Sequence, residues 1–288
     1  MDDPQRINLF FDYIRQNRFR EVRPLIESYL KTHPNSWQAY YQLGYVYFRR
    51  PEAGRSIRAL AKSLELNPLN ADAHKILGLN HVMLGSLDDA EKHLQEAARL
   101  KPDSAEIRYL LGRVYYTRDS YPLARQEFEE AVRLDPTYVK AYDNLGLAWE
   151  ALGNNAVAVE NYHKAIELSR QQGLRYEWPY INLSTHYNRQ NQPDQAVQFA
   201  EKAIEINPRA AHAHFEKGRA LRTREEWEPA ARALGRAIEL DPRKAQYYYV
   251  LSYVYKRLGK EKASSEAMSM FRKLEQAPRA GSPEIATP

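Results

Sequence analysis

Residues 105–138 read AEIRYLLGRVYYTRDSYPLARQEFEEAVRLDPTY, and this stretch of 34 residues decides the fold. Its first half places Leu111, Gly112 and Tyr115 on one helical face. Its second half repeats that spacing with small or apolar residues at positions 124, 128 and 131. Because such spacing is typical of helices that bury one side, the stretch predicts a pair of antiparallel helices. Gly112 indicates a point where the two helices cross too closely for a larger side chain.

The same pattern recurs along most of the chain with a period of 34 residues. Prolines mark this period at positions 34, 68, 102 and 136, and again at 208 and 242. The interval between the two sets is two periods plus four residues, which predicts a longer turn near residues 171–173. Asn-Pro and Asp-Pro pairs disfavour a further helical turn, so we expect them to end the second helix of each pair. The seven repeats are expected at residues 37–70, 71–104, 105–138, 139–176, 177–210, 211–244 and 245–275.

These repeats resemble the tetratricopeptide repeat family over about residues 37–275. The resemblance rests on the Leu-Gly-x2-aromatic positions of the first helix and on the small residues of the second. It implies an all-α fold, a right-handed superhelical solenoid of antiparallel helix pairs, with the first helices lining a concave groove. Arg170 departs from the family pattern because it replaces a proline. Lys217 and Leu221 also depart from it, in the leucine and aromatic positions of the sixth repeat.

The two ends of the chain differ from the repeats. Residues 1–36 keep the terminal proline and apolar faces but lose the glycine and alanine positions, so we expect a degenerate helical pair that caps the array. Residues 276–288 contain three prolines and few apolar anchors, which predicts a disordered tail. The extended character of this tail also suits an occupant of the groove, in this chain or in a neighbour.

Composition excludes several kinds of chemistry. The 288 residues include no cysteine, so no disulfide, thiolate nucleophile or cysteine-type zinc site can form. No phosphate-binding glycine loop occurs, and His74 and His81 fall in packing positions rather than in a metal-ligand motif. We therefore predict a protein without enzyme activity, metal or cofactor. Because the sequence shows no signal peptide and no apolar stretch that could span a membrane, a cytoplasmic location is expected.

The net charge of +5 is unevenly distributed. Residues 1–70 carry eleven Lys and Arg against seven Asp and Glu, and residues 71–210 carry sixteen against twenty. Residues 211–288 carry fifteen against ten. Two mildly basic ends thus flank a mildly acidic middle, without the clustered stripe of a dedicated nucleic-acid-binding protein.

The resemblance also places certain first-helix positions on the groove. Tyrosine, phenylalanine and arginine predominate there, and these residues are enriched where proteins bury contacts with partners. Some of the aromatic residues are equally expected to pack against the neighbouring repeat. The candidate partner-binding residues are Tyr41, Tyr45, Phe48, Arg49, Lys75, Tyr109, Arg113, Tyr116, Asn144, Arg189, Phe215, Arg219, Arg222, Tyr249, Tyr253, Lys256 and Arg257.

One binding mode known in the family is disfavoured. Chaperone-adaptor repeats clamp a terminal carboxylate with five side chains, and only two of those positions match here. The matching residues are Lys75 and Lys140, whereas Leu79, Leu110 and Asn144 occupy the other three positions.

We therefore predict a non-enzymatic scaffold that binds a peptide or protein segment in the Tyr- and Arg-rich groove. Two alternatives stay open. The repeats could bind RNA or another nucleic acid, with tyrosines stacking on bases, or the chain could be the regulatory arm of an enzyme complex. The groove carries no repeating polar code and includes Asp143 and Glu150, so nucleic acid is the less favoured partner.

Overall fold

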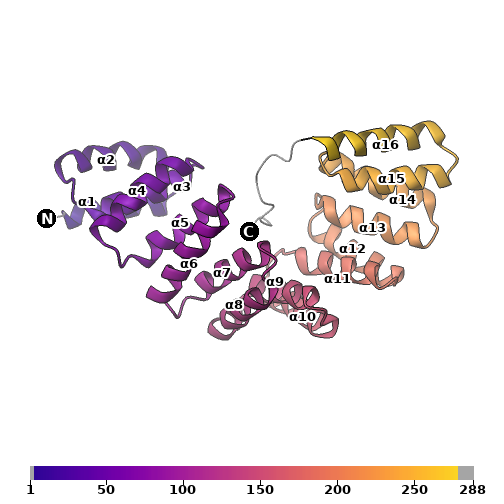
Figure 1. Cartoon of the computed structure of the whole chain (residues 1–288), viewed down its shortest axis with the longest axis horizontal. Helices are drawn as coiled ribbons and strands as arrows, with labels where there is room; N and C mark the ends of the chain where they lie inside the picture. The colour runs from indigo at the N-terminus through magenta and orange to yellow at the C-terminus, as the bar shows by residue number, and fades with distance from the viewer. Residues whose placement is uncertain (1–2, 278–288) are drawn as a thin grey trace. The chain divides into compact units, whose positions relative to one another are not determined.

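The computed structural model describes residues 3–277, and every helix or strand assigned in this range is an α-helix. The chain divides into two compact units, which are described one at a time. Unit 1 covers residues 3–136 and unit 2 covers residues 137–277 of the described range. Within each unit the helices follow one another as antiparallel pairs (Figure 1). The expected fold class, an all-α array of helix pairs, is therefore confirmed.

Each pair consists of an odd-numbered first helix and an even-numbered second helix. Unit 1 contains α1 (Pro4–Arg15), α2 (Phe19–Thr32), α3 (Trp37–Phe48), α4 (Ala53–Leu66), α5 (Ala71–Met83), α6 (Leu87–Leu100), α7 (Ala105–Thr117) and α8 (Tyr121–Leu134). Unit 2 contains α9 (Val139–Ala151), α10 (Asn155–Gln171), α11 (Trp178–Arg189), α12 (Pro193–Ile206), α13 (Ala211–Thr223), α14 (Trp227–Leu240), α15 (Ala245–Arg257) and α16 (Glu261–Gln276). The expected disordered tail lies outside the described residues from position 278 onward.

Local sequence explains where these helices start and stop. Ser36, Asn70 and Ser104 precede α3, α5 and α7, and each side chain accepts a hydrogen bond from the backbone N–H three residues later. These bonds satisfy donors that the first turn of a helix otherwise leaves free. At the other end, α4, α8, α12 and α14 each stop immediately before an Asn-Pro or Asp-Pro pair. Proline lacks the N–H that a further helical turn would need.

A contact between one glycine and one bulky side chain sets the distance between the two helices of a pair. A Cβ atom added to Gly112 in α7 would lie 2.7 Å from the ring of Phe128 in α8. Four other pairs show the same relation, with approach distances of 2.5–2.6 Å and a fully buried partner. These pairs are Gly44 with Leu60, Gly78 with Leu94, Gly146 with Tyr162, and Gly218 with Leu234. Because any larger side chain would collide, glycine is what permits this close packing.

Two pairs carry serine at the glycine position. Ala200 stands sixteen residues after Ser184, where the glycine-containing pairs have a large residue. The hydroxyl of Ser184 donates to the backbone oxygen of Ala196 at 2.8 Å. In the last pair, the hydroxyl of Ser252 donates to the backbone oxygen of Tyr249 at 2.7 Å. In α11 and α12, therefore, a smaller residue on the second helix accompanies a larger one on the first.

Successive first helices also contact one another within each unit, as α3 does α5 and as α11 does α9 and α13. Second helices make no comparable contact with one another in the residues that the structure describes. The first helices therefore line one face of each unit, which we call the inner face. The second helices form the opposite, outer face.

The helices α1 and α2 pack onto the first repeat. The rings of Phe10 and Tyr29 meet edge to face, with centroids 5.6 Å apart. The side-chain amide of Gln42 in α3 donates to the backbone oxygen of Ile7 at 3.1 Å. Ile7, Phe10 and Val46 belong to one buried apolar cluster. The first pair therefore buries its apolar face against the second.

The four additional residues of the fourth repeat are shared between helix and linker, rather than only lengthening the turn. Helix α10 has 17 residues where α8 has 14, and α11 has 12 where α9 has 13. With Arg170 in place of proline, the helix continues to Gln171 before the linker of residues 172–177. Gly173 in this linker has a φ of +65°, a left-handed conformation that glycine adopts at little cost.

The unusual residues of the sixth repeat are accommodated without loss of packing. Leu221, in the aromatic position, is buried in the apolar cluster of α13–α15. Lys217, in the leucine position, places its Nζ 2.8 Å from a carboxylate oxygen of Glu201 in α12. Its ammonium group thus reaches the surface while the helix keeps its place.

Replacing Gly112 by alanine tests the glycine contact. We expect Gly112→Ala to lower the free energy of unfolding by about 1–3 kcal/mol, because the new methyl group collides with Phe128. Gly235→Ala is the matched control, since a Cβ atom there meets no atom within 4 Å. It should stabilise α14 by about 0.5–1 kcal/mol through helix propensity. Urea unfolding followed by circular dichroism measures both. Equal stability of Gly112→Ala and the wild type would contradict the proposed constraint.

Candidate functional site

The aromatic residues expected near the start of the array are half-buried on the inner face of unit 1. Tyr41, Tyr45 and Phe48 pack against the apolar cluster between α4 and α5. Nη1 of Arg49 donates to the hydroxyl of Tyr45 at 2.9 Å, and its guanidinium lies 5.1 Å from the ring centroid of Phe19. Arg49 itself is exposed. This end therefore offers a partner one arginine beside partly covered rings.

Two of the expected groove aromatics lie in the core instead, which corrects the sequence-based prediction. Tyr109 is 5% exposed and Phe215 is 0% exposed. The ring of Tyr109 lies 5.9 Å from that of Phe128, and Phe215 stacks at 4.6 Å on Tyr247 of the next first helix. Neither side chain is accessible to a partner, so neither belongs to the candidate site.

An arginine one turn later lies over each of these buried rings. The guanidinium carbons of Arg113 and Arg219 lie 5.7 Å from the ring centroids of Tyr109 and Phe215, respectively. The spacing of four residues places aromatic and arginine on the same helical face, where a cation–π contact forms. Sequence spacing thus identified the face correctly. It could not show that one member of each pair is buried beneath the other.

The two residues tied to the carboxylate clamp are engaged within the chain. Nζ of Lys75 lies 2.8 Å from a carboxylate oxygen of Glu106 and 3.5 Å from one of Asp72. The side-chain amide of Asn144 donates to the backbone oxygen of Lys140 at 3.0 Å. These contacts compete with any role of Lys75 and Asn144 in binding a partner.

A buried carboxylate in unit 2 pairs with one of the predicted arginines. Oε1 of Glu150 lies 3.1 Å from Nδ1 of His186 and 3.3 Å from Nη1 of Arg189. The other oxygen accepts a hydrogen bond from the hydroxyl of Tyr162 at 3.1 Å. A buried charge is costly unless it is paired, so Arg189 is committed to this carboxylate.

Glu216 holds a second predicted arginine in the same way. It is 1% exposed, and it accepts a hydrogen bond from the side-chain amide of Asn188 at 2.7 Å. Nη1 of Arg219 lies 3.1 Å from both carboxylate oxygens. Sequence analysis missed this acid, although an acid three residues before an arginine on one helix was an available signal. Arg219 is therefore less available to a partner than its position suggested.

Asp143 is a third acid on this face, and neutral groups hold it. The hydroxyl of Tyr176 donates to one carboxylate oxygen at 2.9 Å, and the amide of Asn182 donates to the other at 2.8 Å. Burial raises the pKa of Asp143 from 3.8 to about 7, against the opposing effect of both hydrogen bonds. Tyr176 belongs to the linker of residues 172–177. Asp143 therefore ties this linker to α9 and α11.

The most exposed part of the candidate site lies at the end of unit 2. Tyr249 and Tyr253 of α15 are 51% and 46% exposed. The guanidinium of Arg222 lies over the ring of Tyr253 at 5.9 Å, and that of Arg257 lies over the ring of Trp227 at 4.7 Å. Phe215 is covered by α15, whereas no later first helix covers the equivalent Tyr249 within the described residues.

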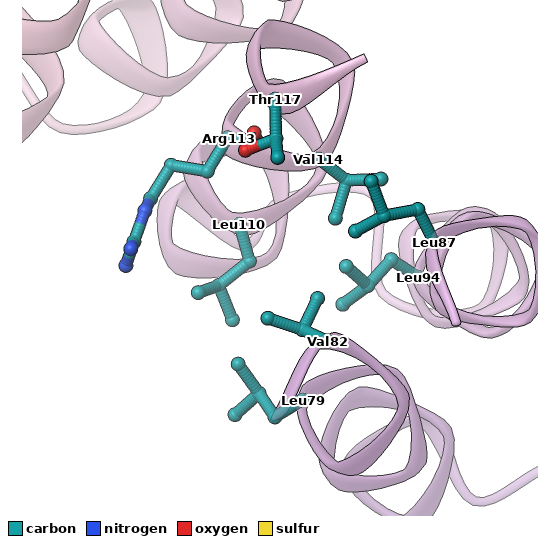
Figure 2. A pocket seen from close by; sticks show the side chains of 8 residues that line it. All are labelled: Leu79, Val82, Leu87, Leu94, Leu110, Arg113, Val114 and Thr117. Carbon is teal, nitrogen blue, oxygen red and sulfur yellow. Dashed lines mark hydrogen bonds between the residues drawn. The ribbon is translucent and has the colours of Figure 1, made fainter. Parts of the chain in front are cut away.

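One small apolar pocket lies between α5, α6 and α7 in unit 1 (Figure 2). Its volume of about 20 Å³ is enough for one water-sized group and too small for a cofactor. Figure 2 shows Leu79, Val82 and Leu110 converging, while the guanidinium of Arg113 points away from them. Tyr116, also on α7, is half-buried and meets Tyr121 edge to face at 5.3 Å. The residues that line the pocket are Leu79, Val82, Leu87, Leu94, Leu110, Arg113, Val114 and Thr117.

Three histidines cluster between α5 and α6. The Nδ1 atoms of His74 and His93 lie 3.1 Å apart, and the rings of His81 and His93 stack at 5.5 Å. Burial lowers the pKa of His74, and burial together with the other two imidazoles lowers that of His93 to about 4. Within residues 3–277, no group of three potential ligands is arranged to hold a metal ion. In the same range, no helix combines the length and apolar character that a membrane crossing requires.

Comparison with known families identifies the class of protein. A tetratricopeptide repeat model matches residues 9–71, 52–105, 77–139 and 216–278, and a second model of this repeat matches residues 138–209. Together these matches span most of the sequence. The chain belongs to the tetratricopeptide repeat family. A search of curated proteins finds no significant match.

Solved structures show the same architecture. A crystal structure of MamA is 26% identical, with a TM-score of 0.54, and the alignment covers 60% of this chain and 98% of that one. A chain of the APC/C hetero-tetramer Cut9-Hcn1 has a TM-score of 0.61 at 16% identity, with 88% of this chain and 49% of that chain covered. At that identity the second likeness shows the fold alone. Because 419 chains of solved structures match, the fold selects no particular partner.

The stability of unit 2 should fall as the pH rises through 7. Folding raises the pKa of Asp143, so the folded state keeps a proton that the unfolded chain has lost between pH 4 and 7. The contribution of this group is therefore complete below pH 4 and declines by about 1.4 kcal/mol per pH unit up to pH 7. We expect Asp143→Asn to remove this component, measured as the difference in urea unfolding between wild type and variant from pH 4.5 to 8. A difference that does not change with pH would contradict it.

The histidine cluster should act in the opposite direction in unit 1. Folding lowers the pKa of His93 to about 4, so the unfolded chain binds more protons as the pH falls below 6.5. Stability is therefore lost on acidification, by about 1 kcal/mol at pH 5 once solvent screening of these half-exposed rings is allowed for. His93→Gln should reduce the loss between pH 7.5 and 5, as read by amide hydrogen exchange in α5 and α6. An identical acid sensitivity in this variant would exclude the cluster as its source.

Proposed function

We propose that this chain is a non-enzymatic scaffold that binds a segment of a partner protein on the inner faces of its helix pairs. One observation carries the proposal. The first helices leave large side chains uncovered at Tyr249 and Tyr253, although the equivalent aromatic residue one repeat earlier, Phe215, is fully buried. Exposed aromatic side chains beside arginine are typical of protein-binding surfaces.

The family supports the same function. Tetratricopeptide repeat arrays are generally scaffolds without catalytic activity, and they bind protein partners. The similar Cut9-Hcn1 structure is described as a hetero-tetramer, an example of this fold in a complex of unlike chains. A cytoplasmic location, expected from the sequence, is part of our proposal for this chain.

The corrected set of candidate binding residues is smaller than the sequence suggested. In unit 1 it comprises Arg49 with the accessible parts of Tyr45 and Phe48, and the rim of the apolar pocket at Leu79 and Arg113. In unit 2 it comprises the exposed residues of α15 and the arginines stacked beside them. The unit 2 residues are Arg222, Tyr249, Tyr253, Lys256 and Arg257.

Affinity capture from a lysate of the source cells tests this function. Tyr249→Ser/Tyr253→Ser should reduce recovery of a protein partner about tenfold, because aromatic anchors contribute much of the binding energy at such interfaces. Leu69→Ser/Leu123→Ser is the matched control. It also replaces two exposed apolar side chains, which are 69% and 43% exposed in a linker and on a second helix.

The outcomes distinguish the competing functions. A protein partner that survives nuclease treatment and is lost only with the tyrosine variant supports the scaffold. A partner lost only with the leucine control would place binding outside the inner face. Recovery of nuclease-sensitive material alone would favour nucleic-acid binding.

A further inference from the structure

We propose that the last two repeats form an anchor for an acidic peptide segment, built from Arg222, Arg257 and the aromatic rings beneath them. The proposal rests on the scaffold function above and specifies the chemistry of the partner at one end of it. It is drawn from which cations on the inner face of unit 2 have a carboxylate partner and which do not.

The paired arginines come first along the chain. Arg189 and Arg219 are held by the buried carboxylates of Glu150 and Glu216. Their charges are therefore largely neutralised within the protein, and a partner carboxylate would compete with an internal one. An acidic ligand gains little at these two positions.

The pattern ends one repeat later. Arg222 occupies the position of Asn188, 34 residues on, and Val250 occupies the position of Glu216. The carboxylate that would receive Arg222 is thus replaced by a buried apolar side chain. In the described part of the chain, Arg222, Lys256 and Arg257 form no ion pair with a carboxylate.

Aromatic rings hold these unpaired arginines in place. The guanidinium of Arg222 lies over Tyr253, and that of Arg257 lies over Trp227. The rings of Tyr253 and Trp227 lie 6.3 Å apart, so one continuous row of alternating cations and rings crosses α13, α14 and α15. A guanidinium stacked on a ring loses little further freedom when its edge binds a carboxylate in a forked geometry.

The same stacking favours a peptide over a nucleic acid. Nucleobases bind single-strand platforms through the faces of aromatic rings. Here the guanidinium groups already lie over Tyr253 and Trp227, whereas the edges of the arginines stay available to carboxylates. Exposed Tyr249 adds apolar area beside this row, with its ring 5.3 Å from that of Phe271. The complement is a segment that carries acidic side chains next to an apolar one.

Fluorescence polarisation with the full chain tests the anchor. The probe is a fluorescein-labelled peptide of ten glutamates, compared with one of ten glutamines and with a labelled ten-nucleotide poly-U RNA. We expect Arg222→Gln/Arg257→Gln to weaken binding of the glutamate peptide about tenfold or more, because two charge-assisted contacts are lost. Arg222→Lys/Arg257→Lys should bind with intermediate affinity, since it keeps the charge but not the stacked fork.

Arg232→Gln/Arg243→Gln is the charge-matched control. It removes the same two charges from exposed positions of unit 2 outside the row and should change affinity less than about twofold. Thermal unfolding by circular dichroism checks that all variants fold. Equal weakening in the two glutamine variants, or no binding of the glutamate peptide, would overturn the proposal. Tighter binding of the RNA, lost with Arg222→Gln/Arg257→Gln, would reassign the row to nucleic acid.

Failure of this inference can be told apart from failure of the scaffold function. If Arg222→Gln/Arg257→Gln still captures the lysate partner that Tyr249→Ser/Tyr253→Ser loses, the acidic anchor is wrong and the scaffold stands. If capture of the partner and binding of the glutamate peptide fall together, both proposals are supported at one surface.

Discussion

The rest of this structure depends on the collision that glycine avoids between the paired helices. In five pairs, a fully buried leucine, phenylalanine or tyrosine fills the space where a Cβ atom would stand on the opposing helix. That contact brings each second helix close to its first helix, and the apolar stripes of both are then buried together. Successive first helices can in turn touch one another and form the inner face. Dense packing of this kind tolerates compensation, as Ser184 with Ala200 illustrates, but not an added methyl group alone.

Charge on the inner face of unit 2 follows from burial. Where a carboxylate is enclosed, the chain supplies a donor from the same or the following first helix, as Glu150 and Glu216 show. Asp143 receives only neutral donors, so its carboxyl keeps a proton to about pH 7. The surface that a partner meets is therefore less charged than the sequence indicates. Its unpaired cations are concentrated at the last repeats.

Sequence periodicity was enough to predict the helix pairs, the close contact at Gly112 and the face on which binding residues lie. Each of these depends on spacing along one helix, which the sequence displays directly. Depth was not predictable in the same way. Phe215 and Tyr249 occupy equivalent positions, yet one is buried beneath α15 and the other is half-exposed, because only the first has a further repeat packed against it.

The sequence by itself determined that this chain is an array of tetratricopeptide repeats, since a 34-residue period with fixed small and apolar positions can bury its stripes only by pairing helices. Only the tertiary structure decided which side chains a partner can reach. Accessibility and ion pairing are set by atoms on neighbouring helices, such as Glu216 beside Arg219 or Trp227 beneath Arg257. Those neighbours come together through packing between helices, and no spacing within one helix specifies it.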